Sequence, residues 1–315
     1  MTALRGITRI VLFVRIAALA RILTPRDFGV FGIAALVLAF LEIITETGIN
    51  VFLLQKKEIE KYLESAWLIS IIRGFIIGLL IYLSVEPVSV FFKSPDVRPL
   101  LYLAALIPVI RGFINPATVK FQKDLFFGRE FTFRMSLVVV ETLATIYFAF
   151  INASAISLIL GMLVSAVFEV VVSFIFIKPR PKLVVDTTHV KEIVSSGKWV
   201  TGYGVFNYLF TQGDNVVVGR ILGESPLGLY QNAYKISTLP LSEVNDIFYR
   251  TTFPIYAKMS DRPKDLKEIV KKHFLVVSFL LLVGGVVLYL FATQIVLIVL
   301  GPAWTSAIPL VKALS

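Results

Sequence analysis

Long apolar runs, each bounded by charged residues, proline or glycine, follow one another along almost the whole chain. A helix needs about 20 residues to cross a hydrocarbon layer about 30 Å thick. Nine runs have that length, and a tenth opens near Thr305. The expected spans are residues 4–23, 28–54, 65–84, 98–118, 131–150, 155–177, 197–220, 226–250 and 272–298. The pattern therefore predicts an all-α, polytopic membrane protein.

Polar side chains interrupt these runs unevenly, and four of the spans carry most of them. At 100° per residue, the polar side chains of the first span fall within an arc of about 120°. These stripes comprise Arg5, Thr8, Arg9 and Arg15 in the first span, Glu42, Thr45 and Glu46 in the second, Asn207, Thr211 and Asp214 in the seventh, and Gln231, Lys235, Ser242 and Asp246 in the eighth. A charge within lipid is costly unless it faces protein or water. Two pairs of striped helices therefore predict one wet central cavity.

Basic residues alternate between the connecting segments, and this alternation predicts the orientation of the helices. The second, fourth, sixth and eighth connections together hold 19 lysines and arginines, whereas the other connections hold five. Cytoplasmic connections carry the excess of basic residues. We therefore expect these four connections and the N-terminus to lie in the cytoplasm.

A short motif occurs twice in the chain. Residues 21–31 (RILTPRDFGVF) align without gaps with residues 220–230 (RILGESPLGLY), an offset of 220 − 21 = 199 residues. Both copies fall in the turn between the first and second span of a six-helix unit. Because six is even, both units enter the membrane in the same orientation, which makes this a parallel repeat. Chance similarity between short apolar strings is the alternative explanation.

The repeat divides the chain into two predicted lobes around the central cavity. Residues 1–196 form an N-terminal six-helix lobe, and residues 197–315 form a partial C-terminal lobe of about four helices. A second unit as long as the first would run to about residue 400. We therefore expect the chain to be a fragment, or a truncated product, of a transporter with at least about twelve helices.

Composition narrows the chemistry that the chain can carry. The chain is 57% apolar and 17% charged, and its mean hydropathy of +0.83 is far from that of soluble domains. It has no cysteine and two histidines, which argues against a metal site. It also lacks a Walker A phosphate loop and a nucleophile elbow, and its outer connections are short. We expect no catalytic residue and no cofactor, and the scattered basic residues argue against nucleic-acid binding.

The charges within the spans are candidate functional groups. Arg15, Arg111 and Lys235 are expected to face the cavity and hold an anion, because an arginine fork bonds two phosphate oxygens and stays charged. Arg9 is a further candidate, although it can also extend to the cytoplasmic interface. Structural pairing is the alternative for the first three, with the possible partners Glu42, Glu46, Asp214 and Asp246.

Uncharged and acidic side chains in the striped spans form a second group of candidates. They would line the cavity, and the carboxylates among them could couple transport to an ion, although hydrogen bonding between helices explains them equally well. This group comprises Glu46, Asp214, Asn207, Gln231 and Asp246. Arg73, Glu141 and Glu169 are exceptions in otherwise apolar spans, and for Arg73 an interhelical partner is a sufficient explanation.

The repeated motif also carries a family resemblance. Residues 19–31 (LARILTPRDFGVF) resemble the opening of Wzx-type polysaccharide flippases, and residues 212–234 resemble the segment that opens their second lobe. The resemblance covers essentially the whole chain, but its motifs are structural rather than catalytic. It implies the multidrug/oligosaccharidyl-lipid/polysaccharide exporter superfamily, in which two six-helix lobes give alternating access to a central cavity. Family members have about twelve to fourteen helices, so the resemblance implies that several helices of the second lobe are absent here.

The resemblance implies a function in surface polysaccharide synthesis. Such proteins flip undecaprenyl-pyrophosphate-linked repeat units across the bacterial cytoplasmic membrane for O-antigen, capsule, exopolysaccharide or teichuronic acid. The implied partners are the lipid-linked oligosaccharide, membrane lipids, a polysaccharide polymerase and other assembly proteins. The alternatives are a multidrug or peptidoglycan-precursor exporter on the same scaffold, a membrane glycan polymerase or ligase, and a non-transporting scaffold for the assembly machinery.

Overall fold

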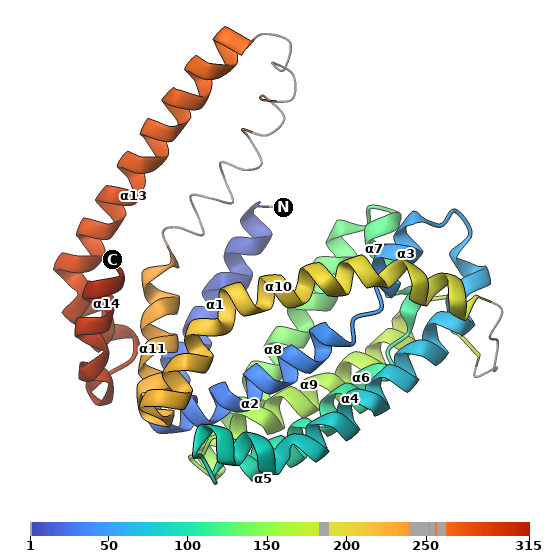
Figure 1. Cartoon of the computed structure of the whole chain (residues 1–315), viewed down its shortest axis with the longest axis horizontal. Helices are drawn as coiled ribbons and strands as arrows, with labels where there is room; N and C mark the ends of the chain where they lie inside the picture. The colour runs from blue at the N-terminus through green and yellow to red at the C-terminus, as the bar shows by residue number, and fades with distance from the viewer. Residues whose placement is uncertain (1, 183–188, 240–251, 253–255, 257–262) are drawn as a thin grey trace. The chain divides into compact units, whose positions relative to one another are not determined.

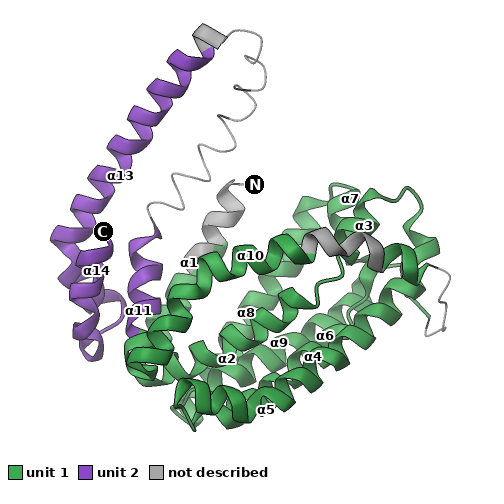
Figure 2. Cartoon of the chain, in the orientation of Figure 1, with its two compact units in different colours: residues 1–228 green, residues 229–315 purple. Residues whose placement is uncertain are grey.

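Helices are the regular secondary structure throughout the part of the chain that the structure describes. The structure is a computed structural model and describes residues 2–182, 189–239, 252, 256 and 263–315 (Figure 1). Two compact units, residues 1–228 and residues 229–315, make up the chain (Figure 2). The described residues form helices and no strands, which confirms the predicted all-α class. Helices suit lipid because each helix satisfies its own backbone hydrogen bonds. The lobe boundary expected between residues 196 and 197 stays a prediction.

The helices of unit 1 follow the first seven predicted spans in order. Their bounds are α1 Thr2–Ala20, α2 Pro25–Ile44, α3 Ile49–Gln55, η1 Ile59–Tyr62, α4 Leu63–Phe92, α5 Val97–Ala104, α6 Leu106–Gly112, η2 Pro116–Val119, α7 Lys120–Lys123, α8 Phe127–Ile151, α9 Ile156–Phe176 and α10 Val190–Leu222. The unit ends within the first turn of α11, Glu224–Ser237. Figure 1 shows α3 and α7 near one end of this unit and α5 near the opposite end.

The second predicted span is broken into two helices, so the expectation of one helix over residues 28–54 was wrong. Thr24 and Asp27 form a capping box that begins α2, with Pro25 at its first position. At the other end, the Thr45 hydroxyl donates to the Leu41 carbonyl, and Gly48 adopts a left-handed φ of 64° before α3. The apolar periodicity continues across this break, which is why the sequence pattern did not reveal it.

The third and fourth spans also differ from their predicted bounds. Residues 63–92 form one continuous helix, α4, which retains Pro87 inside it and extends well beyond predicted residue 84. The run expected over residues 98–118 instead divides at Ala105 into α5 and α6. Beyond Gly112 the chain bends by 75° into the η2 and α7 segment. Residues of this bent segment line a cavity of unit 1.

Close helix crossings in unit 1 are built from small residues. A Cβ added to Gly112 of α6 would lie 2.9 Å from the Ser70 carbonyl oxygen of α4, and one added to Gly78 of α4 would lie 2.8 Å from the Ala105 carbonyl oxygen. Such contacts leave no room for a side chain. Behind them, α2, α4, α5 and α9 share an apolar core that includes Ile33, Ile81, Leu101 and Ile159.

Long apolar helices with exposed apolar faces show that the chain is a multi-pass membrane protein. Five of the described helices are long and apolar enough to cross a membrane, or six if the bent segment of α5 to α7 counts as one. A shorter apolar helix, Val11–Ala20, lies within α1. Phe150 and Phe176 are each 75% exposed, as expected of side chains that face lipid.

Unit 2 contains the rest of α11, then α13 Pro263–Val299, η3 Pro302–Ala307 and α14 Ile308–Leu314. The chain turns back after α13 at Gly301, whose φ of 96° favours glycine. Trp304 is fully buried beneath this turn, and the Ser237 hydroxyl donates to the Val311 carbonyl at 3.4 Å. The short α14 begins where the tenth span was expected to open.

Candidate functional site

A charged cavity of about 570 Å³ lies in unit 1, at the end that carries α3 and α7. Its walls come from the end of α2, the start of α3, the middle of α4, the end of α6, the η2 and α7 segment, the start of α8 and the later part of α9. The ionisable residues that line it are Glu42, Glu46, Arg73, Arg111, Glu130, Arg134 and Glu169. Charges of both signs therefore meet inside a bundle of otherwise apolar helices. Such a space holds water and can accept polar ligands.

Arg73 of α4 joins its own helix to the broken end of α2. Its Nη2 lies 3.1 Å from Glu46 Oε2 and donates to the Glu42 carbonyl, while its Nε lies 3.4 Å from Thr45 Oγ1. The last carbonyls of a helix lack intrahelical partners and carry partial negative charge, so a guanidinium stabilises them. Glu46 also accepts from the Gly48 N–H at 3.0 Å. Arg73 thereby connects α4 to the residues between α2 and α3 at the cavity wall. This contact confirms the prediction that Arg73 has an interhelical partner.

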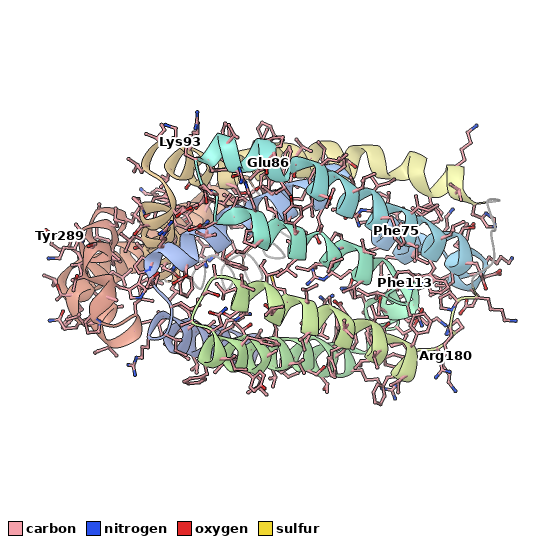
Figure 3. The ribbon with its side chains drawn as sticks, turned by 90° about the horizontal axis from the view of Figure 1, so that it is seen from below. Phe75, Glu86, Lys93, Phe113, Arg180 and Tyr289 are labelled. Carbon is pink, nitrogen blue, oxygen red and sulfur yellow. The ribbon has the colours of Figure 1, made fainter. Side chains whose placement is uncertain are left out.

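Arg111, near the end of α6, lies between two carboxylates from different helices. Its Nη1 is 3.6 Å from Glu42 Oε1 of α2, and its Nε is 3.8 Å from Glu169 Oε2 of α9. Both distances exceed those of a hydrogen bond, and the buried Nε has no hydrogen-bond partner among the described residues. Phe113 packs edge-on against Phe75 of α4, with ring centroids 6.3 Å apart (Figure 3). This contact keeps the end of α6 beside α4.

Arg15 is held in a tight ion pair outside the cavity lining. Its Nη1 lies 2.7 Å from Glu141 Oε1, which links α1 to α8, and the two side chains are only 14% and 21% exposed. The sequence had suggested Glu42, Glu46, Asp214 or Asp246 as the structural partner of Arg15. That prediction was wrong, because the partner is Glu141. Buried opposite charges attract strongly when little water separates them, which explains how Arg15 and Glu141 can both lie within apolar stretches of their helices.

The remaining predicted residues lie on other surfaces or outside the described residues. Asn207 and Asp214 are exposed on α10 and are not among the residues that line the cavity. In unit 2, Gln231 is half-buried and Lys235 is exposed on α11. The side chain of Arg9 and the whole of Asp246 fall outside the residues that the structure describes.

Several cavity residues were not selected as site residues from the sequence. Arg73, Glu42 and Glu169 each occur in a span, where they were interpreted as partners or as isolated exceptions. Their common signal is that an isolated charge in a lipid-spanning helix requires an opposite charge from another helix. Glu130 and Arg134 lie at the start of α8 and pair at 2.9 Å, and the sequence placed them in a connection rather than at a cavity.

Comparison with known proteins places this architecture in a family. The family described as "Polysaccharide biosynthesis protein" matches residues 18–309, which is most of the chain. The chain belongs to this family. The match begins near the end of α1 and ends at the start of α14, so it extends through both units.

Curated relatives give the same assignment. The chain is 26% identical over 304 residues to the lipopolysaccharide biosynthesis protein WzxC of Escherichia coli, with 96% of this chain and 62% of the relative covered. It is 26% identical to the teichuronic acid biosynthesis protein TuaB of Bacillus subtilis, covering 97% and 64%. It is 22% identical to the succinoglycan biosynthesis transport protein ExoT of Rhizobium meliloti, covering 96% and 62%. The chain thus spans less than two thirds of the length of these relatives.

A solved structure shows the same fold. It is described as the inward-facing conformation of a multidrug resistance MATE family transporter of the MOP superfamily. The TM-score is 0.62 at 14% sequence identity, with 97% of this chain and 75% of that chain covered. This likeness confirms the predicted helical membrane fold.

Proposed function

We propose that this chain forms the larger part of a flippase that moves undecaprenyl-pyrophosphate-linked oligosaccharides across the bacterial cytoplasmic membrane for surface polysaccharide synthesis. The charged cavity of about 570 Å³, walled by apolar helices, carries this proposal. An unpaired hydroxyl moved into hydrocarbon costs about 2–7 kcal/mol, so an oligosaccharide needs a wet passage through the membrane. The polyprenyl tail can remain in lipid, because its transfer requires no polar surface.

Arg111 is the residue proposed to hold the pyrophosphate. Its guanidinium lies loosely between Glu42 and Glu169, and its Nε is unbonded. Two phosphate oxygens can accept hydrogen bonds from one guanidinium, at shorter N–O distances than those to these two carboxylates. Glu42 and Glu169 then hold the Arg111 guanidinium in place while no substrate is bound. Lys235 and Arg9 remain proposed anion contacts, whereas Arg15 supports the bundle through Glu141.

Alternating access is the proposed transport mechanism. The solved relative is described as inward-facing, and the cavity in this chain lies at the end of unit 1 that the basic connections assign to the cytoplasm. We accordingly assign this structure to an inward-open state with a cytoplasmic N-terminus. Glu46 is the proposed coupling carboxylate, because it lines the cavity and pairs with Arg73 across two helices. Asn207, Asp214, Gln231 and Asp246 are proposed to contact the glycan in other states.

One observation favours a second candidate, the export of cationic compounds. The cavity is lined by four glutamates and three arginines, so it does not present the strongly basic surface that an anion-specific site would have. A cation can pair with Glu42 or Glu169 after displacing Arg111.

Neither proposal requires this chain to catalyse bond formation, so the length of the glycan should stay unchanged during transport. A polymerase or ligase would instead lengthen or transfer the glycan.

Reconstituted protein can separate these candidates. Arg111→Gln should slow the flipping of a fluorescent lipid-linked oligosaccharide about tenfold to a hundredfold, since a charge-assisted hydrogen bond contributes about 1.5–3 kcal/mol. Arg111→Lys should retain part of the activity. Arg129→Gln removes an exposed arginine from α8 and is the matched control. Wild-type flipping rates in folded Arg111→Gln would refute the assignment of Arg111. Transport of organic cations, with no flipping of lipid-linked oligosaccharide, would favour the exporter.

A further inference from the structure

The two copies of the repeated motif meet each other in space. Pro25 begins α2 and Glu224 begins α11, and these positions are equivalent under the 199-residue offset of the repeat. Gly29 and Gly228 are likewise equivalent and occupy the fifth position of their helices. All four residues belong to unit 1. The first turns of α2 and α11 lie at the end of unit 1 away from α3 and α7 (Figure 1).

Each glycine approaches the first carbonyl of the opposite helix. A Cβ added to Gly29 would overlap the carbonyl oxygen of Glu224, and one added to Gly228 would overlap the carbonyl oxygen of Pro25. The Cβ of Gly228 would also lie 2.8 Å from the backbone nitrogen of Gly29. Because equivalent residues exchange equivalent contacts, the two helix starts are related by a local pseudo-twofold axis. Only glycine permits this backbone approach.

Polar side chains surround the glycine crossing. Arg26 Nε lies 2.8 Å from Glu224 Oε2, and Arg26 Nη2 lies 2.6 Å from Asp96 Oδ2. The fully buried Ser94 donates to the other oxygen of Glu224, and Arg220 donates to the Phe91 carbonyl. Arg26 is 63% exposed, so water can replace its partners at little cost when the helices separate. The ion pairs therefore select one register without making the contact permanent.

Apolar side chains close the space directly behind the crossing. Val30 follows Gly29, Leu227 precedes Gly228, and both are buried in one core cluster with Phe92. A glycine contact backed by packed hydrocarbon excludes water along the line between the two helices. The crossing thus has the two properties that a reversible seal requires, close backbone contact and a dry layer beneath it.

We propose that the reciprocal crossing of Gly29 and Gly228 is the outer gate of the transport path. This inference rests on the proposed function and assigns the gate to the non-cytoplasmic end. The crossing seals that end while the charged cavity is open at the opposite end, and the two helix starts part when access alternates. Its construction from both copies of the repeat lets a rotation of one repeat against the other open it symmetrically.

Cysteine labelling tests the gate without any transport assay. The chain contains no cysteine, so Ser94→Cys supplies a single thiol at a fully buried position behind the gate. A membrane-impermeant maleimide added from the outer side should label Gly29→Ala or Gly228→Ala versions of this protein at least about tenfold faster than Ser94→Cys alone, because the added methyl group overpacks the closed crossing. Gly202→Ala is the control, since an added Cβ there meets nothing within 4 Å. Equal labelling of all four proteins would overturn the proposal.

A crosslinking experiment covers the case in which the alanine variants do not fold. Arg26→Cys and Glu224→Cys, introduced together, replace a contacting pair across the gate. Crosslinking them with a short thiol reagent should stop transport of lipid-linked oligosaccharide, and cleavage of the linker should restore it. Undiminished transport by the crosslinked protein would overturn the gate. If the wild-type protein moves no substrate, the proposed function fails, whereas the labelling result still decides whether this crossing opens.

Discussion

Arg15 Nη1 lies 2.7 Å from Glu141 Oε1, and this ion pair joins α1 to α8 within the bundle. Both side chains are largely shielded from water. Removing one partner leaves a charge that neither lipid nor apolar protein can solvate. The pair therefore has a structural role, which separates Arg15 from the cavity arginines with which its sequence pattern grouped it.

The first prediction concerns the stability of this pair. Arg15→Ala or Glu141→Ala should lower the free energy of unfolding by about 3 kcal/mol, because each leaves its partner buried and uncompensated. Replacing both by leucine should recover most of that loss. Denaturant unfolding in detergent micelles measures both effects, with Lys272→Ala as a control that removes an exposed pair and should cost less than about 0.5 kcal/mol. If replacing both residues by leucine lowers the free energy of unfolding by the sum of the two single losses, the two side chains do not stabilise each other.

The second prediction concerns Asn115, whose side chain anchors the start of η2 to the end of α9. Its Nδ2 donates to the Ile177 and Pro179 carbonyls at 3.2 and 3.1 Å, and its Oδ1 accepts from the Ala117 N–H at 2.9 Å. Asn115→Ala should cost about 2–3 kcal/mol, since it leaves buried backbone groups unpaired. Thermal unfolding checks this value. The exposed Asn152→Ala is the comparison, and a similar loss for both would contradict the anchoring role.

The third prediction concerns the α8–α9 crossing at Gly161. A Cβ added there would overlap Thr145 Oγ1 and lie 2.9 Å from Thr145 Cβ. Gly161→Ala should destabilise the protein by about 1–3 kcal/mol through overpacking. Adding Thr145→Ala should restore part of the stability, because it removes the overlapping atoms. Gly128→Ala is the control on the same helix pair, since nothing lies within 4 Å of its added Cβ. Failure of Thr145→Ala to rescue would argue against this contact.

The fourth prediction concerns ion coupling at Glu46. If this carboxylate binds the coupling cation, Glu46→Gln should remove the dependence of transport on an imposed proton or sodium gradient. A gradient of one pH unit supplies about 1.4 kcal/mol, enough to change a coupled equilibrium about tenfold. Initial rates in proteoliposomes with and without the gradient measure this coupling. Glu58→Gln, which alters an exposed pair, should leave it intact. A gradient response retained by Glu46→Gln would exclude Glu46 as the coupling site.

The local pattern of apolar and polar residues was sufficient to predict the helical fold. In lipid each helix must satisfy its own backbone hydrogen bonds, so hydropathy over about 20 residues determines whether a segment is helical. The same local information identified the repeat, and with it the family. It did not reveal the break at Gly48 or the bend beyond Gly112, because both are set by caps and carbonyl partners rather than by apolar periodicity.

By itself, then, the sequence determined the helical membrane class, the order of the helices and the two related copies of the motif. Tertiary structure decided which charges pair, since Arg15 and Glu141 are 126 residues apart and no local pattern connects them. It also decided that Gly29 and Gly228 meet. The physical reason is range: helix formation in lipid depends on neighbours along the chain, whereas ion pairs and close backbone contacts depend on how distant helices pack.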